Sequence, residues 1–181
     1  MKIPIPKLKA MLRYFATFTD PRLLGKTKLM KLFYFTDFGH VKKYASPITC
    51  DNYVHLEHGP IPSTIMNFVN AVENDTESAI LGDTIQIERR EGSNMKRIVA
   101  LRDFTPKDSE YFSQTELKTM ESVCKRFKGF TGKEIEDISH KEGAFLKTEE
   151  GESIPYVLAA EDQDCLIGRK ELESLLSLTQ C

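Results

Sequence analysis

The feature that most constrains the fold is residues 25–44, a helical pattern whose apolar side chains do not keep to one face. Leu29, Leu32 and Phe33 recur at helical spacing, but Tyr34 extends the apolar surface around the helix. A helix that is apolar on most sides is buried on most sides. We therefore expect a central helix here. Its lysines should reach solvent along their apolar stems, namely Lys28, Lys31, Lys42 and Lys43.

A rigid corner is predicted where the chain reads His-Gly-Pro-Ile-Pro, residues 58–62. Each proline fixes its own φ and pushes the preceding residue out of the helical region, so Gly59 and Ile61 should be extended. Pro62 suits the first turn of a helix, because its missing N–H has no partner to lose there. The corner should therefore present Glu57 and the neighbouring histidine with little conformational freedom left to lose.

The remaining patterns predict mostly helices. Residues 7–18 have helical apolar spacing, and capping boxes open helices at Ser113 and Thr131. Residues 85–90 and 97–102 alternate around Gly92-Ser93-Asn94, which is typical of a β-hairpin. Residues 154–158 resemble a short edge strand, and residues 169–176 a last helix. The sequence predicts one helix-rich α+β domain over 1–181, with about six helices around a central buried helix and a small antiparallel β-hairpin.

Composition and charge limit the class of protein. Hydrophobic residues make up 40% and charged residues 29%, and no run of about 18 apolar residues predicts a membrane-spanning helix. The amino end lacks the apolar core of a signal peptide, so we expect a cytoplasmic protein with no membrane partner. Residues 1–50 carry ten Lys/Arg and two Asp/Glu, or +8, against −10 for the rest. This basic quarter either attracts an acidic partner or neutralises the acidic remainder, and we favour the second interpretation.

Residues that could carry chemistry do not form a recognisable catalytic or metal-binding pattern. The metal-binding types with the closest spacing fit no trusted zinc pattern, and Gly25-Lys26-Thr27 lacks the upstream glycine of a phosphate loop. Cys124 falls on an expected core face, so it is a poor nucleophile. We therefore expect no catalytic residues, no metal and no cofactor. The metal-binding types considered are Cys50, His55 and His58, with His40 and His140.

Polar and aromatic residues beside the corner are the best candidates for a binding surface. A stiff turn that carries charged and aromatic groups is a common way to build such a surface. Each group also has a possible structural role: Asp51 could form an Asx turn, His58 could satisfy backbone groups, and Asp37 could pair with a lysine. The candidates are Lys28, Lys31, Tyr34, Asp37, Asp51, Tyr53, Glu57 and His58.

The most specific pattern runs from Lys28 to Phe35, through Asp37 and Tyr44, to Pro47-Ile48-Thr49-x-Asp51-x-Tyr53-Val54 and Glu57-His58-Gly59-Pro60-Ile61-Pro62-Ser63. With the Ser139-His140 pair and Gly151-x-x-Ile154-Pro155-Tyr156, this pattern resembles the Panacea domain of SocA-like antitoxins and phage-associated GepA-like proteins. The resemblance covers about residues 5–160, leaving 161–181 as a helical extension. Cys50 stands where a glycine is more usual, and Phe145 where a tryptophan is.

The resemblance implies that the chain is a bacterial antitoxin, which binds a protein toxin encoded beside it and holds that toxin inactive. Some relatives instead act as adaptors that deliver a toxin to a protease, so a protease is a possible second partner. We expect the toxin on the surface shared by residues 25–44 and the corner, and we add Pro60 and His140 to the candidate residues. A phage- or mobile-element-associated interaction protein of another kind is the second alternative, a nucleic-acid-binding regulator the third, and an enzyme ranks last.

Overall fold

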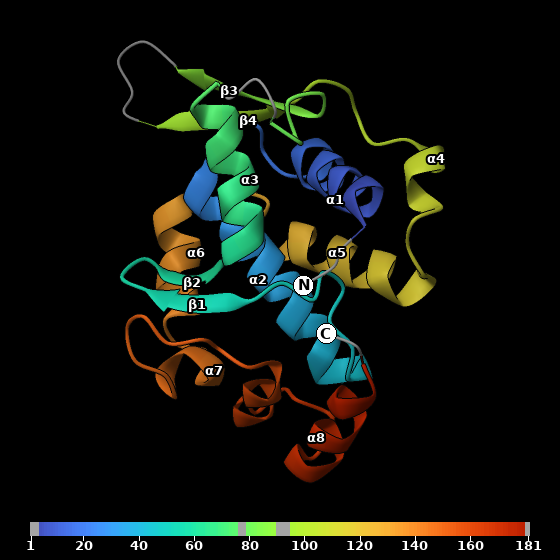
Figure 1. Ribbon diagram of the computed structural model, residues 1–181, viewed down its shortest axis with the longest axis vertical. Helices are drawn as coiled ribbons and strands as arrows, with labels where there is room; N and C mark the ends of the chain where they lie inside the picture. The colour runs from blue at the N-terminus through green and yellow to red at the C-terminus, as the bar shows by residue number, and fades with distance from the viewer. Residues whose placement is uncertain (1–3, 76–78, 90–94, 180–181) are drawn as a thin grey trace.

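The computed structural model describes residues 4–75, 79–89 and 95–179, and it is helix-rich with two small antiparallel sheets, as the sequence predicts (Figure 1). None of the helices in these ranges has the length and apolar character needed to cross a membrane. The elements are α1 (Ile5–Phe18), α2 (Lys26–Tyr44), β1 (Tyr53–Leu56), β2 (Gly59–Pro62), α3 (Ser63–Glu73), β3 (Ile85–Arg89), β4 (Lys96–Ala100), α4 (Pro106–Ser109), α5 (Gln114–Phe127), α6 (Gly132–Ser139), α7 (Gly143–Leu146), the 3₁₀ helix η1 (Tyr156–Glu161) and α8 (Arg169–Leu178).

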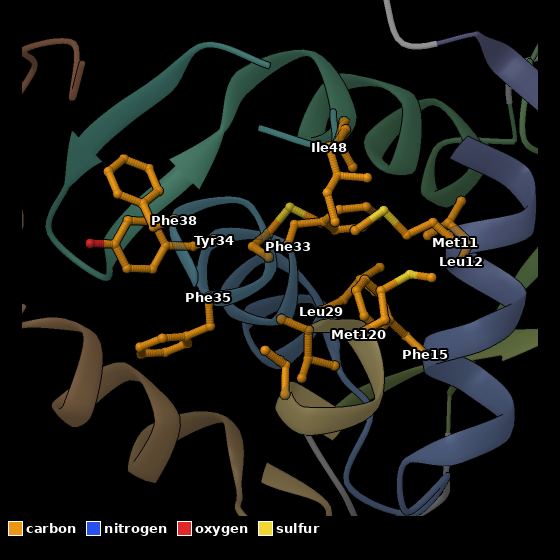
Figure 2. Packing of buried hydrophobic residues seen from close by; sticks show 14 of the residues in the cluster. Met11, Leu12, Phe15, Leu29, Phe33, Tyr34, Phe35, Phe38, Ile48 and Met120 are labelled. Carbon is orange, nitrogen blue, oxygen red and sulfur yellow. The ribbon is translucent and has the colours of Figure 1, made fainter. Parts of the chain in front are cut away.

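Helix α2 is the buried centre of the fold, which confirms the expectation from its apolar pattern. Figure 2 shows its side chains leaving the helix in opposite directions, with Phe33 on the side of α1 and Tyr34 on the other. The Phe33 ring packs edge-to-face on Phe15 of α1, with ring centroids 5.1 Å apart. Tyr34 instead contacts Phe38 and, on strand β1, Tyr53. Because α2 is packed on every side, little of its surface is exposed to solvent.

Three of the four lysines expected in solvent are buried, so that prediction is wrong for them. Lys28 and Lys31 are fully buried, and Lys42 is 5% exposed. Each amine has a fixed acceptor, because a buried ammonium without partners is too costly to keep. Lys28 Nζ donates to the carbonyls of Lys128 and Phe130, just after α5. Only Lys43 extends into solvent, as expected.

Strands β1 and β2 form a tight antiparallel hairpin in the register Tyr53↔Pro62 to Leu56↔Gly59. The segment around Ser153 covers the outer edge of β1, where Ile154 N donates to the Tyr53 carbonyl at 2.8 Å. Figure 1 shows this hairpin beside α2, with α6 and α7 around it. The predicted edge strand 154–158 is wrong, because Tyr156 begins a 3₁₀ helix directly after Pro155.

The second hairpin, β3–β4, is confirmed, with Ile85 opposite Ala100; its predicted turn, residues 92–94, lies outside the described residues. Both predicted capping boxes are also present. The Ser113 hydroxyl accepts from Glu116 N, and the Thr131 hydroxyl accepts from Glu134 N. These elements form where predicted because their signals lie within a few residues of one another.

A buried carboxylate joins α2 to the loop that leads into β1. Asp37, fully buried, accepts hydrogen bonds from Ile48 N at 2.8 Å, Thr49 N at 2.9 Å and the Tyr53 hydroxyl at 2.9 Å. The Thr49 hydroxyl donates to the same group. Burial raises the pKa of Asp37, while these donors act in the opposite direction. The carboxylate therefore fixes the path of the chain between α2 and the hairpin.

Replacing Asp37 with alanine should leave several buried donors without an acceptor. We expect Asp37→Ala to lower the free energy of unfolding by about 3–5 kcal/mol. Tyr53→Phe removes a single donor and should cost about 1–2 kcal/mol. Urea unfolding of both variants measures the two losses. Equal losses would contradict the role of Asp37 as the shared acceptor.

Candidate functional site

The corner predicted from the prolines is the two-residue loop of the β1–β2 hairpin. Glu57 and His58 form the loop and are exposed, whereas Gly59 and Pro60 directly after it are buried. Gly59 has φ +86°, a conformation that L side chains rarely adopt. The chain thus turns sharply, leaving two polar side chains at the surface.

A buried polar cluster supports the underside of this loop. Lys31 Nζ of α2 donates to the Pro60 carbonyl at 2.9 Å. A methyl group placed on Gly59 would lie 2.7 Å from Ser139 Oγ, 2.9 Å from Lys31 Nζ and 3.0 Å from His140 Cδ2. We call Lys31, Gly59, Pro60, Ser139 and His140 the corner cluster. Its tight packing requires glycine at position 59.

Burial controls the charge of the corner cluster. It lowers the pKa of Lys31 to about 7, although the nearby Glu136 carboxylate acts in the opposite direction. Burial also lowers the pKa of His140, whose Nε2 has no hydrogen-bond partner among the described residues. The Glu136 carboxylate accepts a hydrogen bond from Lys133 Nζ at 3.0 Å and lies 3.6 Å from Nδ1 of His58. It therefore connects the exposed loop to α6.

Three stacked rings fix the hairpin to α6 and α7. His55 of β1 stacks on Phe145 with centroids 3.7 Å apart, and His140 stacks on Phe145 at 4.7 Å, with an interplanar angle of 8°. His55 Nδ1 also hydrogen-bonds to the Thr148 hydroxyl at 3.0 Å. Phe145, where the resemblance would place a tryptophan, thus holds three elements together without a polar ring atom.

The structure brings together some of the predicted site residues and separates others. Lys31, Pro60 and His140 belong to the corner cluster, and Glu57 and His58 lie exposed above it. The others are buried in structural contacts and do not face solvent. Lys28 of α2 donates to the carbonyl of Lys128 after α5, and Tyr34 lies in the aromatic core. Tyr53 donates to the buried carboxylate of Asp37. Asp51 accepts from Thr64 N and Ile65 N at the start of α3.

Glu136 and Lys133 were not predicted from the sequence. Glu136 lies four residues before His140, so the two share a face of α6, and this spacing was the available signal. Lys133 is exposed, and its Nζ also pairs with Asp137 at 2.9 Å. The exposed corner surface therefore consists of Glu57, His58, Lys133 and Asp137, and we use that name for these four residues.

Two groups beside Gly59 are of types that serve in serine–lysine catalysis. Lys31 Nζ and Ser139 Oγ both border this glycine, but both residues are fully buried and Ser139 Oγ donates to the Glu136 carbonyl. Among the described residues, no three His, Cys, Asp or Glu side chains are grouped so that they could hold a metal ion.

Most cations of the basic quarter, residues 1–50, have partners within the protein. Within residues 4–50 every Lys and Arg except Lys43 contacts a carboxylate or a carbonyl oxygen. This pairing supports the interpretation that the charge asymmetry is internal, and it leaves few free cations there for an acidic partner. The carboxylate pairs are Lys7–Glu116, Lys9–Asp83, Arg13–Asp108, Arg22–Asp20, Lys26–Glu73 and Lys42–Glu142.

Comparison with known proteins gives one match. The family model described as antitoxin SocA-like, Panacea domain, matches residues 29–144, a range that includes α2 from Leu29 onward, both hairpins and the corner cluster. No curated protein and no solved structure matches the chain.

Two glycines with the same φ allow the cost of backbone strain to be distinguished from the cost of steric overlap at the corner. Gly59 and Gly151 both have φ +86°, but an added methyl group meets nothing within 4 Å at Gly151. We expect Gly151→Ala to cost about 1–2 kcal/mol of stability from backbone strain. Gly59→Ala should cost about 2–5 kcal/mol, because steric overlap adds to the strain. Chemical denaturation tests this difference, and similar losses would contradict the tight packing of the corner cluster.

The titration of Lys31 should be visible as a pH dependence of stability. The ordinary pKa of lysine is 10.5, so between about pH 7 and that value the unfolded chain binds the Lys31 proton and the folded chain does not. Stability should therefore rise with pH in this window. Relative to Lys31→Met, the wild type should gain about 1.4 kcal/mol per pH unit between about pH 7.5 and 9.5. Urea titrations measure the gain; a constant difference would show that buried Lys31 stays protonated.

Proposed function

The chain belongs to the family of SocA-like antitoxins with a Panacea domain, and on this premise we propose that it is the antitoxin of a toxin–antitoxin pair. The family model covers more than half of the chain. In this proposal the protein contacts a cognate protein toxin directly, in the bacterial cytoplasm, and holds it inactive. The family match is the observation that carries the proposal.

The exposed corner surface is our proposed contact for the toxin. Glu57 and His58 stand on a two-residue loop that Lys31 and the stacked rings fix from beneath. Leu56 and Leu146, the residues that follow His55 and Phe145 in the chain, are 41% and 67% exposed and add apolar area to this part of the protein. A surface that is ordered before binding loses less conformational entropy in the complex, which favours the tight binding that neutralisation requires.

The buried candidates act in this proposal by shaping the surface. Lys31 positions Pro60, and Asp37 positions the segment that enters β1. Charge reversal of Lys31 would place a carboxylate beside Glu136 and damage the fold, so its effect on binding would not report a contact. The exposed residues are the ones that test the interface.

We further propose that the protein acts by binding and carries out no reaction. The Lys31–Ser139 pair lacks exposure, and Ser139 already has its own acceptor. A role on nucleic acid is disfavoured by the pairing of the basic quarter, since phosphate binding depends on cations that are free to release counterions. Delivery of the toxin to a protease remains a variant of the same binding event.

Expression of the neighbouring gene tests the function. That gene alone should arrest bacterial growth, co-expression of this protein should restore growth, and the two proteins should purify as a complex. The toxin level distinguishes the two modes: it stays constant under direct inhibition and falls under delivery to a protease. A harmless neighbour that does not co-purify would contradict the antitoxin proposal.

Substitutions on the exposed loop test the contact surface. We expect Glu57→Ala combined with His58→Ala to weaken toxin binding at least about tenfold, because both side chains lie at the centre of the proposed interface. Lys107→Ala is the matched control, an exposed residue on α4 away from the hairpin (Figure 1). Calorimetry on purified pairs measures the affinities. Rescue and affinity equal to wild type in the double variant would place the toxin elsewhere.

A further inference from the structure

A small groove lies between helices α2 and α5, away from the corner. One face of α2 gives Phe35, Phe38 and Gly39, and α5 gives Val123 and Arg126. The groove has a volume of about 150 Å³, which matches a cavity that holds a benzene-sized group. Its other lining residues are Lys42, Lys43, Thr119, Ser122, Glu142 and Asp164. We call this pocket the α2–α5 groove.

Gly39 keeps the floor of the groove open. Glycine inside a helix lowers its stability relative to alanine. Here packing does not require glycine, because an added methyl group would lie 3.9 Å from Thr119 Cγ2, an ordinary contact distance. The missing side chain has a clear effect on the groove, since a methyl group at this position would occupy part of its volume.

Arg126 provides a cation in the lining of the groove. Its guanidinium lies over the rings of Phe127 and Phe35, at 4.6 Å and 5.4 Å from their centroids. Within the described part of the chain, neither a carboxylate nor another acceptor is paired with the Arg126 side chain. A planar guanidinium held on aromatic faces is suited to bidentate binding of a carboxylate. Lys43 likewise has no ion pair among the described residues.

Carboxylates in the same lining limit the kind of anion that can bind. Glu142 and Asp164 line the groove and pair with Lys42 at 2.7 Å and 2.9 Å, and Asp162 adds a third carboxylate around the same amine. These carboxylates outnumber the ammonium that they surround and would repel the successive phosphates of a nucleic acid, while Arg126 and Lys43 are left to attract a single carboxylate. A segment with a single carboxylate beside an apolar side chain avoids this repulsion.

We propose that the α2–α5 groove binds a segment of a protein partner in which an aspartate or glutamate adjoins a large apolar side chain. The apolar side chain enters the pocket against Phe35, Phe38 and Gly39, while the carboxylate pairs with Arg126. This site is separate from the exposed corner surface, and the inference does not depend on the antitoxin proposal.

Titration of the isotope-labelled full chain with two short peptides tests the site by NMR. The probes are acetyl-Phe-Glu amide and acetyl-Phe-Lys amide, with a single-stranded thymidine oligonucleotide as the polyanion. The acidic peptide should shift amide signals in residues 35–43 and 119–126, with a dissociation constant of about 1 mM. The lysine peptide and the oligonucleotide should leave these signals in place. Shifts with either of them, or none with the acidic peptide, would overturn the proposal.

Two variants separate binding from folding. Arg126→Gln should weaken binding of the acidic peptide at least about fivefold, since one charge-assisted pair is lost. Gly39→Ala should weaken it as well, while raising the melting temperature by about 2 °C through better helix propensity. Lys118→Gln, exposed on the same helix two turns earlier, is the control and should bind like the wild type. Unchanged affinity in both groove variants would overturn the assignment.

Discussion

The burial of α2 on all sides is the constraint on which the rest of the structure depends. A buried charged group is costly without a partner, and four charged side chains on this helix each fix a different segment. Lys28 holds the segment after α5, Lys31 holds the hairpin, Asp37 holds the loop before β1, and Lys42 holds the segments around α7 and η1. The positions of these four residues along α2 therefore fix where each of the contacted segments lies along the helix.

Local signals in the sequence predicted much of the fold. The capping boxes, the β3–β4 hairpin and the central position of α2 all depend on patterns within a short window. The burial of Lys28, Lys31 and Lys42 could not be predicted in this way, because their acceptors lie far along the chain; Lys28 and Phe130, for example, are 102 residues apart. Tyr156 was placed in a strand for the same reason, since its contact with the Asp51 carbonyl is a tertiary one.

The candidate site was partly predictable. The pattern placed a corner near residues 58–62, and Glu57 and His58 lie exposed there as expected. The turn itself is only these two residues: Gly59 has φ +86° where an extended conformation was expected, and Pro62 ends β2 directly before α3. The residue types around it suggested an open binding surface, whereas Lys31 and Asp37 are buried supports. Their roles differ because charge in the sequence does not say whether a group meets solvent or a backbone carbonyl. Glu136 was missed because a glutamate on an amphipathic helix is ordinarily just a solvated residue.

The division between supports and surface has a consequence for partner choice. Substitutions of Lys31, Asp37 or Gly59 lower the stability of the fold, because each of these residues satisfies or fits buried neighbours. The exposed loop residues have few such contacts; His58 has 70% of its side chain exposed and a single carboxylate neighbour at 3.6 Å. Substitutions there can change the partner without changing the frame. Under our proposal that the exposed corner surface is the contact for a partner, specificity would be set by a few side chains on the loop while the supports beneath it stay the same.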